Sequence, residues 1–143
     1  MKHYESSALI EAAPEAVWAV LADGSQYPSW DSGVTAVEGD IVDGGKITVR
    51  TEVSPNRAFP VLVALDPPRL MVWTGGLPLG LFRGTRTFSL DDAPGGSTLF
   101  TMREEFTGPL LGLVWRTMPD LGPSFERFVR GLKACVEGRH CAG

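Results

Sequence analysis

Apolar residues recur at every third or fourth position through the last long segment of the chain, Pro109 to Glu137. The positions of this apolar stripe are Leu111, Val114, Met118, Leu121, Phe125, Phe128, Leu132 and Cys135. The spacing predicts a long helix with one buried face, at about 1.5 Å per residue. Pro119 and Pro123 lie inside the stripe, and an interior proline kinks or breaks a helix. We therefore expect one helical axis that is kinked or broken near Met118–Pro123.

Before this helix the pattern changes to a period of two, in which apolar and polar side chains alternate. Such alternation is typical of strands with one face in solvent. The segments expected to be strands are Tyr4–Ile10, Val34–Asp40, Lys46–Ser54, Phe59–Leu65, Leu70–Thr74, Phe82–Leu90 and Ser97–Phe106. Short turns connect the last six of these strands, which favours an antiparallel meander.

Two short helices are expected between the first two strands. Pro14 and Glu15 suit a first helical turn, because proline has no N–H to leave unpaired and an acidic side chain complements the helix dipole. The segment Ser25–Asp31 contains Pro28 and has room for one or two turns at most. The order of elements predicts an α+β fold, in which a curved seven-stranded antiparallel sheet surrounds a long C-terminal helix. We expect a single domain over residues 1–143, with a disordered tail at 138–143.

Arg86 and Glu104 are expected to meet on the inner face of this sheet. By period two, Arg86 shares a face with Phe88, and Glu104 shares a face with Met102. A register that pairs Phe88 with Met102 also pairs Arg86 with Glu104, whereas a slip of two residues separates them. An inward ion pair is costly unless each partner satisfies the other. The pair is either structural or a polar anchor for a ligand, and a register that turns both side chains outward remains open.

The segment from Gly75 to Phe82 mixes leucines with glycines and a proline, although a solvent loop is usually polar. We read it as a loop that packs on the rest of the molecule, that covers a cavity mouth, or that forms a subunit contact. The glycines would allow it to move.

Composition narrows the range of functions. The 143 residues carry a net charge of −4, which argues against a nucleic-acid surface. No apolar run reaches the length of about 18 residues that a membrane-spanning helix needs. The N-terminal residues lack the apolar core of a signal peptide, so a cytoplasmic location is expected. The histidines, His3 and His140, lie at the two ends, and we expect no metal and no cofactor.

Several stretches resemble the START/Bet v 1-like superfamily, also called SRPBCC or polyketide cyclase/dehydrase. They are Ala12–Trp18, Tyr27–Trp30, Leu70–Gly75, Phe88–Leu90, Gly95–Thr98 and Glu105–Gly108. The resemblance covers residues 4 to 137 and implies a helix-grip fold with a cavity between the sheet and the C-terminal helix. Related bacterial sequences carry a histidine where this chain has Arg86, so a role for that histidine does not transfer.

Three functions follow as hypotheses from the residues and the resemblance. The first is binding of a small hydrophobic ligand, lipidic or aromatic. The second is a cyclase or dehydrase reaction on a polyketide-like substrate, in which Arg86 steadies an enolate and Glu104 moves a proton. The third is a protein-interaction module, and a homodimer is one form that it could take. The residues expected to line the cavity are Arg86, Glu104, Trp30, Trp73, Phe88, Met102, Leu111, Trp115, Met118 and Leu121. Packing in the core is the alternative for each aromatic residue.

Overall fold

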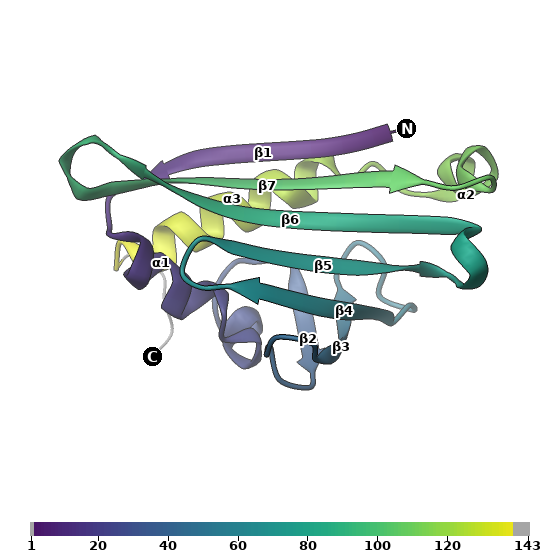
Figure 1. Cartoon of the computed structure of the whole chain (residues 1–143), viewed down its shortest axis with the longest axis horizontal. Coiled ribbons are helices and arrows are strands. Elements are labelled where there is room, and N and C mark those ends of the chain that lie inside the picture. Colours follow the sequence, from purple (N-terminus) through teal and green to yellow (C-terminus); the bar gives the residue numbers. More distant parts are fainter. Residues whose placement is uncertain (1, 139–143) are drawn as a thin grey trace.

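A computed structural model describes residues 2–138 of the chain. One antiparallel sheet of seven strands has the order β1-β7-β6-β5-β4-β3-β2 (Figure 1). The strands are β1 (Lys2–Ile10), β2 (Val34–Glu38), β3 (Lys46–Thr51), β4 (Phe59–Asp66), β5 (Leu70–Leu77), β6 (Phe82–Ala93) and β7 (Ser97–Thr107). The predicted α+β architecture, a curved sheet around a C-terminal helix, is confirmed and is the helix-grip fold.

Helices connect the strands and cover the inner face of the sheet. The α-helices are α1 (Pro14–Leu21), α2 (Leu111–Thr117) and α3 (Gly122–Val136). The short 3₁₀ turns are η1 (Gly24–Ser29), η2 (Pro78–Gly80) and η3 (Pro94–Gly96). The two short helices predicted after the first strand correspond to α1 and η1. Pro14 begins α1, as proline should where no N–H partner exists.

The C-terminal segment contains two separate helices, so of the two expected alternatives near Met118–Pro123, a kink or a break, the structure has the break. Met118 has an extended backbone, with φ −77° and ψ 139°, because the residue before a proline is pushed out of the helical region. Pro123 lies in the first turn of α3, where it is well tolerated. The prolines therefore end one helix and begin the next.

The predicted loop from Gly75 to Phe82 is shorter in the structure. β5 continues through Leu77 and β6 begins at Phe82, and these two residues pair across the hairpin. Gly75 and Gly76 are thus part of the sheet. Strands pair through backbone hydrogen bonds, so a strand can continue through residues that lack alternating apolar and polar side chains. Only the η2 turn and Leu81 remain as loop.

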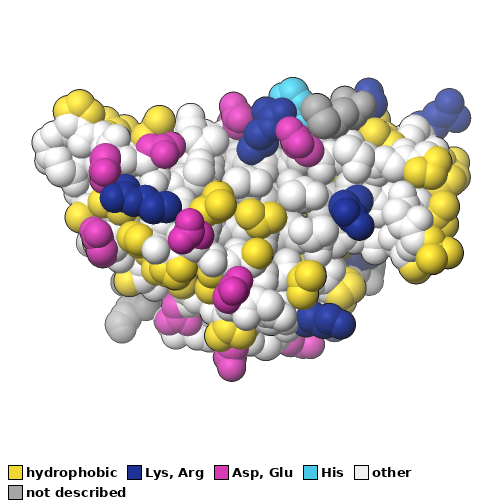
Figure 2. Space-filling model, viewed as in Figure 1, with side chains coloured by type: hydrophobic (Ala, Val, Ile, Leu, Met, Phe, Trp, Pro, Cys, Tyr) yellow, Lys and Arg dark blue, Asp and Glu magenta, His cyan; other side chains and the backbone are white. Residues whose placement is uncertain are grey.

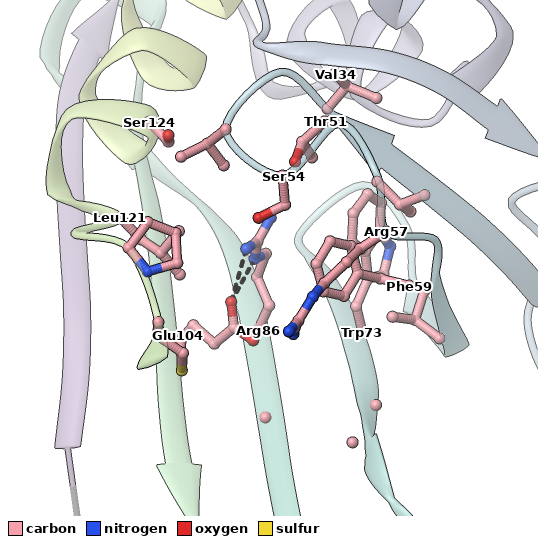
Figure 3. A pocket seen from close by; sticks show the side chains of 18 of the residues that line it. Val34, Thr51, Ser54, Arg57, Phe59, Trp73, Arg86, Glu104, Leu121 and Ser124 are labelled. Carbon is pink, nitrogen blue, oxygen red and sulfur yellow. Dashed lines mark hydrogen bonds and ion pairs between the residues drawn. The ribbon is translucent and has the colours of Figure 1, made fainter. Parts of the chain in front are cut away.

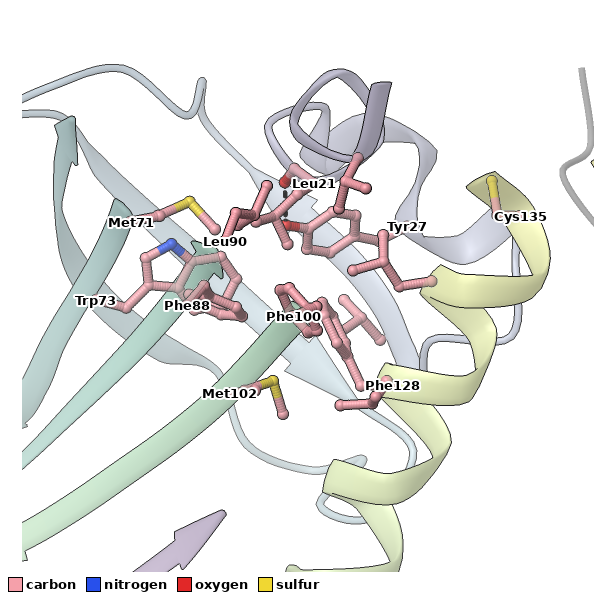
Figure 4. Close-up of a cluster of buried hydrophobic side chains, with 14 of the residues drawn as sticks. Leu21, Tyr27, Met71, Trp73, Phe88, Leu90, Phe100, Met102, Phe128 and Cys135 are labelled. Carbon is pink, nitrogen blue, oxygen red and sulfur yellow. Dashed lines mark hydrogen bonds between the residues drawn. The ribbon is translucent and has the colours of Figure 1, made fainter. Parts of the chain in front are cut away.

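The core lies between α3 and the sheet and is rich in aromatic rings (Figure 4). Phe128 of α3 makes edge-to-face contacts with Tyr27 and Trp30, at 5.6 Å and 5.1 Å between ring centroids. Phe88 of β6 packs against Phe128 at 5.8 Å. The buried Tyr27 hydroxyl donates a hydrogen bond to the Leu21 carbonyl, and burial raises the pKa of Tyr27. This cluster fixes one end of α3 to α1, η1 and the sheet.

Gly131 permits the close approach of α3 to the loop before β2. A Cβ at this position would lie 2.2 Å from the Asp31 carbonyl oxygen and 2.7 Å from the carbonyl carbon. Both atoms belong to the backbone, so a side chain could not be accommodated by a simple rotation. The glycine therefore sets the distance between the helix and this loop.

Within residues 2–138, no helix combines the length and the apolar character needed to cross a membrane.

Candidate functional site

A cavity of about 950 Å³ opens between the inner face of the sheet and the α2–α3 segment (Figure 3). Strands β3 to β7 supply one wall, through residues such as Val49, Trp73 and Met102. The helical side supplies Val114 of α2, together with residues at the break between α2 and α3 such as Met118 and Leu121. A cavity of this size with a mainly apolar lining is suited to a small organic ligand.

Arg86 and Glu104 form an ion pair in the wall of this cavity. The predicted register is confirmed, since Arg86 pairs with Glu104 and Phe88 pairs with Met102 across β6 and β7. Arg86 Nε and Nη2 both donate to Glu104 Oε1, at 2.9 Å and 2.7 Å. The two side chains are 21% and 14% exposed, so the pair is mostly withdrawn from solvent. The Arg86 guanidinium also lies over the Phe125 ring, 4.8 Å from its centroid.

Gly84 provides the space for the second oxygen of Glu104. A Cβ at position 84 would lie 2.6 Å from Glu104 Oε2. Both hydrogen bonds from Arg86 reach Oε1, and Oε2 makes no hydrogen bond with the part of the chain that the structure describes. One carboxylate oxygen is thus held in place, while the other can accept a hydrogen bond or a proton from a ligand.

Six of the ten predicted cavity residues line the cavity. They are Arg86, Glu104, Trp73, Met102, Met118 and Leu121. Trp73 and Met102 are almost fully buried and form its floor, whereas Met118 and Leu121 come from the non-helical residues between α2 and α3. The helix break therefore contributes directly to the wall.

The other four predicted residues lie outside the cavity. Trp30 and Phe88 are 4% and 0% exposed and belong to the aromatic core around Phe128. Trp115 stacks on Tyr4 at 5.5 Å, because the helix break turns its side chain toward β1 instead of the cavity. Leu111, at the start of α2, is not among the lining residues either. The expectation of a single helical axis placed both residues of α2 in the cavity lining, where the structure does not have them.

The loop between β3 and β4 also lines the cavity, although the sequence marked it only as a turn. Its lining residues are Ser54, Pro55, Asn56, Arg57 and Ala58. In Figure 3 the Arg57 side chain extends from this loop toward the side on which Arg86 and Glu104 lie. Arg57 is exposed and forms no ion pair with any described residue. An arginine in a Ser-Pro-Asn turn was the only signal that could have drawn attention to this loop.

Arg127 of α3 ties the helix to the rim beside this loop. Its guanidinium contacts Asp31 Oδ1 at 2.7 Å and Glu52 Oε2 at 2.6 Å. The hydrogen bond to Asp31 raises the pKa of Arg127, and the contact with Glu52 adds to the effect. Because all three side chains are more than a third exposed, the pairs fix geometry more than they add stability.

Two buried polar atoms of cavity residues lack hydrogen-bond partners among residues 2–138. They are Trp73 Nε1 and Thr51 Oγ1. Unpaired buried polar groups are uncommon in folded proteins, since each carries a desolvation cost. No group of three or more His, Cys, Asp or Glu side chains suited to a metal ion occurs in the described range. His140, Cys141 and most of the expected disordered tail lie outside that range.

Three solved structures show how widely this fold is shared. The Zhui aromatase/cyclase from Streptomyces sp. R1128 has 15% identity and a TM-score of 0.73, with 96% of this chain and 94% of that chain covered. A START superfamily protein from Mycobacterium smegmatis has 15% identity and a TM-score of 0.68, with 94% and 97% covered. The Aha1 dimer from Colwellia psychrerythraea has 17% identity and a TM-score of 0.73, with 97% and 98% covered. At these identities the likeness concerns the fold.

No match was found among curated proteins. The sequence does match a family model over residues 1–137, nearly its whole length. That family is described as polyketide cyclase / dehydrase and lipid transport, in agreement with the helix-grip fold and the cavity found here. The chain therefore belongs to the polyketide cyclase/dehydrase and lipid transport family.

Proposed function

We propose that this protein binds a small hydrophobic ligand, lipidic or aromatic, in the cavity between the sheet and the α2–α3 segment. The observation that carries the proposal is the cavity of about 950 Å³ with the Arg86–Glu104 pair in its otherwise mainly apolar wall. Family membership supports a ligand-binding or cyclase role in general terms. We favour ligand binding over a cyclase reaction, because a mainly apolar cavity of this size is by itself sufficient for binding.

The charges around the cavity indicate what kind of ligand it suits. Its charged lining residues are Arg57, Arg86 and Glu104. Arg86 and Glu104 neutralise each other, which leaves Arg57 as the uncompensated charge. An amphipathic ligand with an apolar body and one acidic or carbonyl end matches this arrangement, because its polar end could approach Arg57 and the Arg86 side of the pair.

Methionine NMR provides a site-specific test. On titration with a fluorescent anionic probe such as anilinonaphthalene sulfonate, the methyl resonances of Met102 and Met118 should shift with saturable, one-site behaviour, because both residues line the cavity. Met71 is fully buried but does not line the cavity, so its resonance should stay in place and serves as the control. Probe binding without shifts at Met102 and Met118, or no binding at all, would contradict the proposal.

A proton-transfer reaction on a polyketide-like substrate is the second candidate, and the geometry of Glu104 favours it. Oε2 of Glu104 is oriented by the two hydrogen bonds on Oε1 and carries none of its own from described residues. It could remove a proton from a carbon between two carbonyl groups, while Arg86 stabilises the resulting enolate.

For this second candidate, Glu104→Gln should reduce turnover of a linear β-ketoacyl thioester by a factor of at least about 100, since general-base catalysis contributes that much. The amide keeps the shape of the side chain, so probe affinity should change little. Product formation would be followed by absorbance. Equal turnover by the variant and the natural protein would exclude Glu104 as the base.

A further inference from the structure

The end of the molecule formed by the β5–β6 hairpin and α2 exposes a group of leucines, called here the apolar tip. It comprises Leu77, Leu79, Leu81 and Leu113, which are 46%, 95%, 38% and 64% exposed. The Leu110 N–H donates to the Leu81 carbonyl at 2.9 Å, which joins the start of α2 to the hairpin. Figure 2 shows hydrophobic side chains gathered at this end of the molecule. A group of four exposed leucines indicates a surface that another molecule contacts when the protein functions.

Leu79 is the most exposed member of the apolar tip, and its backbone is unfavourable for leucine. Its φ of 62° lies in the left-handed region, which glycine or asparagine occupies at much lower cost. With 95% of the residue in solvent, no packing within the chain compensates for this conformation. A leucine at this position therefore fits a contact with something outside the chain.

Basic residues outnumber acidic ones in the segments that build the end with the apolar tip, although the whole chain is acidic. In the segments that build this end, 53–60, 75–85 and 107–121 together with Lys2, four residues are basic and one is acidic. They are Lys2, Arg57, Arg83, Arg116 and Asp120. Lys2 reaches α2, since its ammonium lies 5.3 Å from the Trp115 ring centroid. Because these segments carry a net charge of +3, the rest of the molecule is more acidic than the whole chain, and its acidic residues include Asp91 and Asp92 near the opposite hairpin.

The apolar tip is continuous with the cavity. Leu77 and Phe82 of the hairpin and Val114 of α2 line the cavity, while Leu79 and Leu113 point away into solvent. Whatever covers the tip consequently lies beside the cavity wall.

We propose that the apolar tip docks on the surface of an anionic lipid bilayer. Protruding aliphatic side chains can enter the interface between headgroups and acyl chains, and the basic rim is attracted to anionic headgroups. A convex tip with net positive charge does not suit a second copy of this chain, because two such tips would repel each other. The cavity would then face a source or a destination for apolar ligands.

Vesicle co-sedimentation tests the docking. The full chain should pellet with phosphatidylcholine vesicles that contain phosphatidylglycerol, bind pure phosphatidylcholine vesicles at least tenfold more weakly, and be released by salt. The double variant Leu79→Asp/Leu113→Asp should lose at least tenfold in vesicle affinity. The matched control is Leu9→Asp/Leu62→Asp, which changes leucines that are 50% and 48% exposed on other parts of the sheet and should bind like the natural protein.

A second pair of variants tests the basic rim. Arg83→Glu/Arg116→Glu should also weaken binding to anionic vesicles at least tenfold, whereas Arg130→Glu, at an exposed position on α3, should have a smaller effect. Thermal melts would verify that each variant is folded. Absence of vesicle binding by the natural protein would overturn the proposal, as would equal binding by the tip and control variants. Loss of a homodimer in the Leu79 variant, with no vesicle binding, would instead assign the tip to a second copy.

Vesicle binding requires no ligand in the cavity. A failure of this experiment would therefore leave the proposed ligand binding untouched, and the methionine titration could fail while docking holds.

Discussion

Replacement of Gly131 by alanine is expected to lower the free energy of unfolding by about 3 kcal/mol, at the upper end of the usual cost of overpacking. Helix propensity alone predicts the opposite, a gain of about 1 kcal/mol. The clash decides the sign, because the new methyl carbon would lie 2.2 Å from the Asp31 carbonyl oxygen. Helix α3 would have to move away from the loop that carries Asp31, which also strains the contact between Asp31 and Arg127. Urea denaturation followed by circular dichroism would measure the loss.

Gly112→Ala is the matched control for this prediction. Gly112 is also helical, but a Cβ there would meet nothing within 4 Å. Its substitution should leave stability unchanged or raise it by up to about 1 kcal/mol. If both variants behaved alike, the close approach at Gly131 would not be a feature of the protein in solution.

Glu104→Leu is expected to cost about 3 kcal/mol, because it leaves the Arg86 guanidinium without its partner in a mostly buried position. Arg86→Leu should cost a similar amount for the converse reason. The double variant Arg86→Leu/Glu104→Leu should recover most of the loss, since two apolar side chains would then face each other in an apolar wall.

Denaturation of the natural protein, both single variants and the double variant would complete a double-mutant cycle. A coupling energy near zero, with the double variant losing as much as the sum of the single variants, would contradict a paired arrangement. The same double variant should retain apolar probes but discriminate poorly among ligands that differ in their polar end.

The alternation of side chains carried much of the information on the sheet. Phe88 and Met102 are large and apolar, and only one register buries both while leaving Arg86 beside Glu104. Burying a charged side chain without a partner costs free energy, so the register that pairs Arg86 with Glu104 is preferred, which is why it could be predicted. The order of β2 to β7 followed from the short turns between them, whereas the pairing of β1 with β7 has no such signal in the sequence.

The helical side of the cavity was harder to predict. A stripe with helical spacing continues across Pro119, but spacing says nothing about the direction of the chain after a break. As a result Trp115 was assigned to the cavity, although it packs on Tyr4. The β3–β4 loop was missed because loops have no periodic pattern, and the position of Arg57 depends on the curvature of the whole sheet.

The break between α2 and α3 has a kinetic consequence. With seven residues, α2 is too short to be stable alone. It is attached through Trp115, which contacts Tyr4, Phe106 and the Lys2 ammonium, and through the backbone hydrogen bond from Leu110 to Leu81. Detachment of α2 is therefore a local unfolding event, with a free energy well below that of the whole domain. The residence time of a ligand in the cavity would then depend on the contacts of Trp115 with Tyr4 and Phe106, and the core around α3 could remain intact at each exchange.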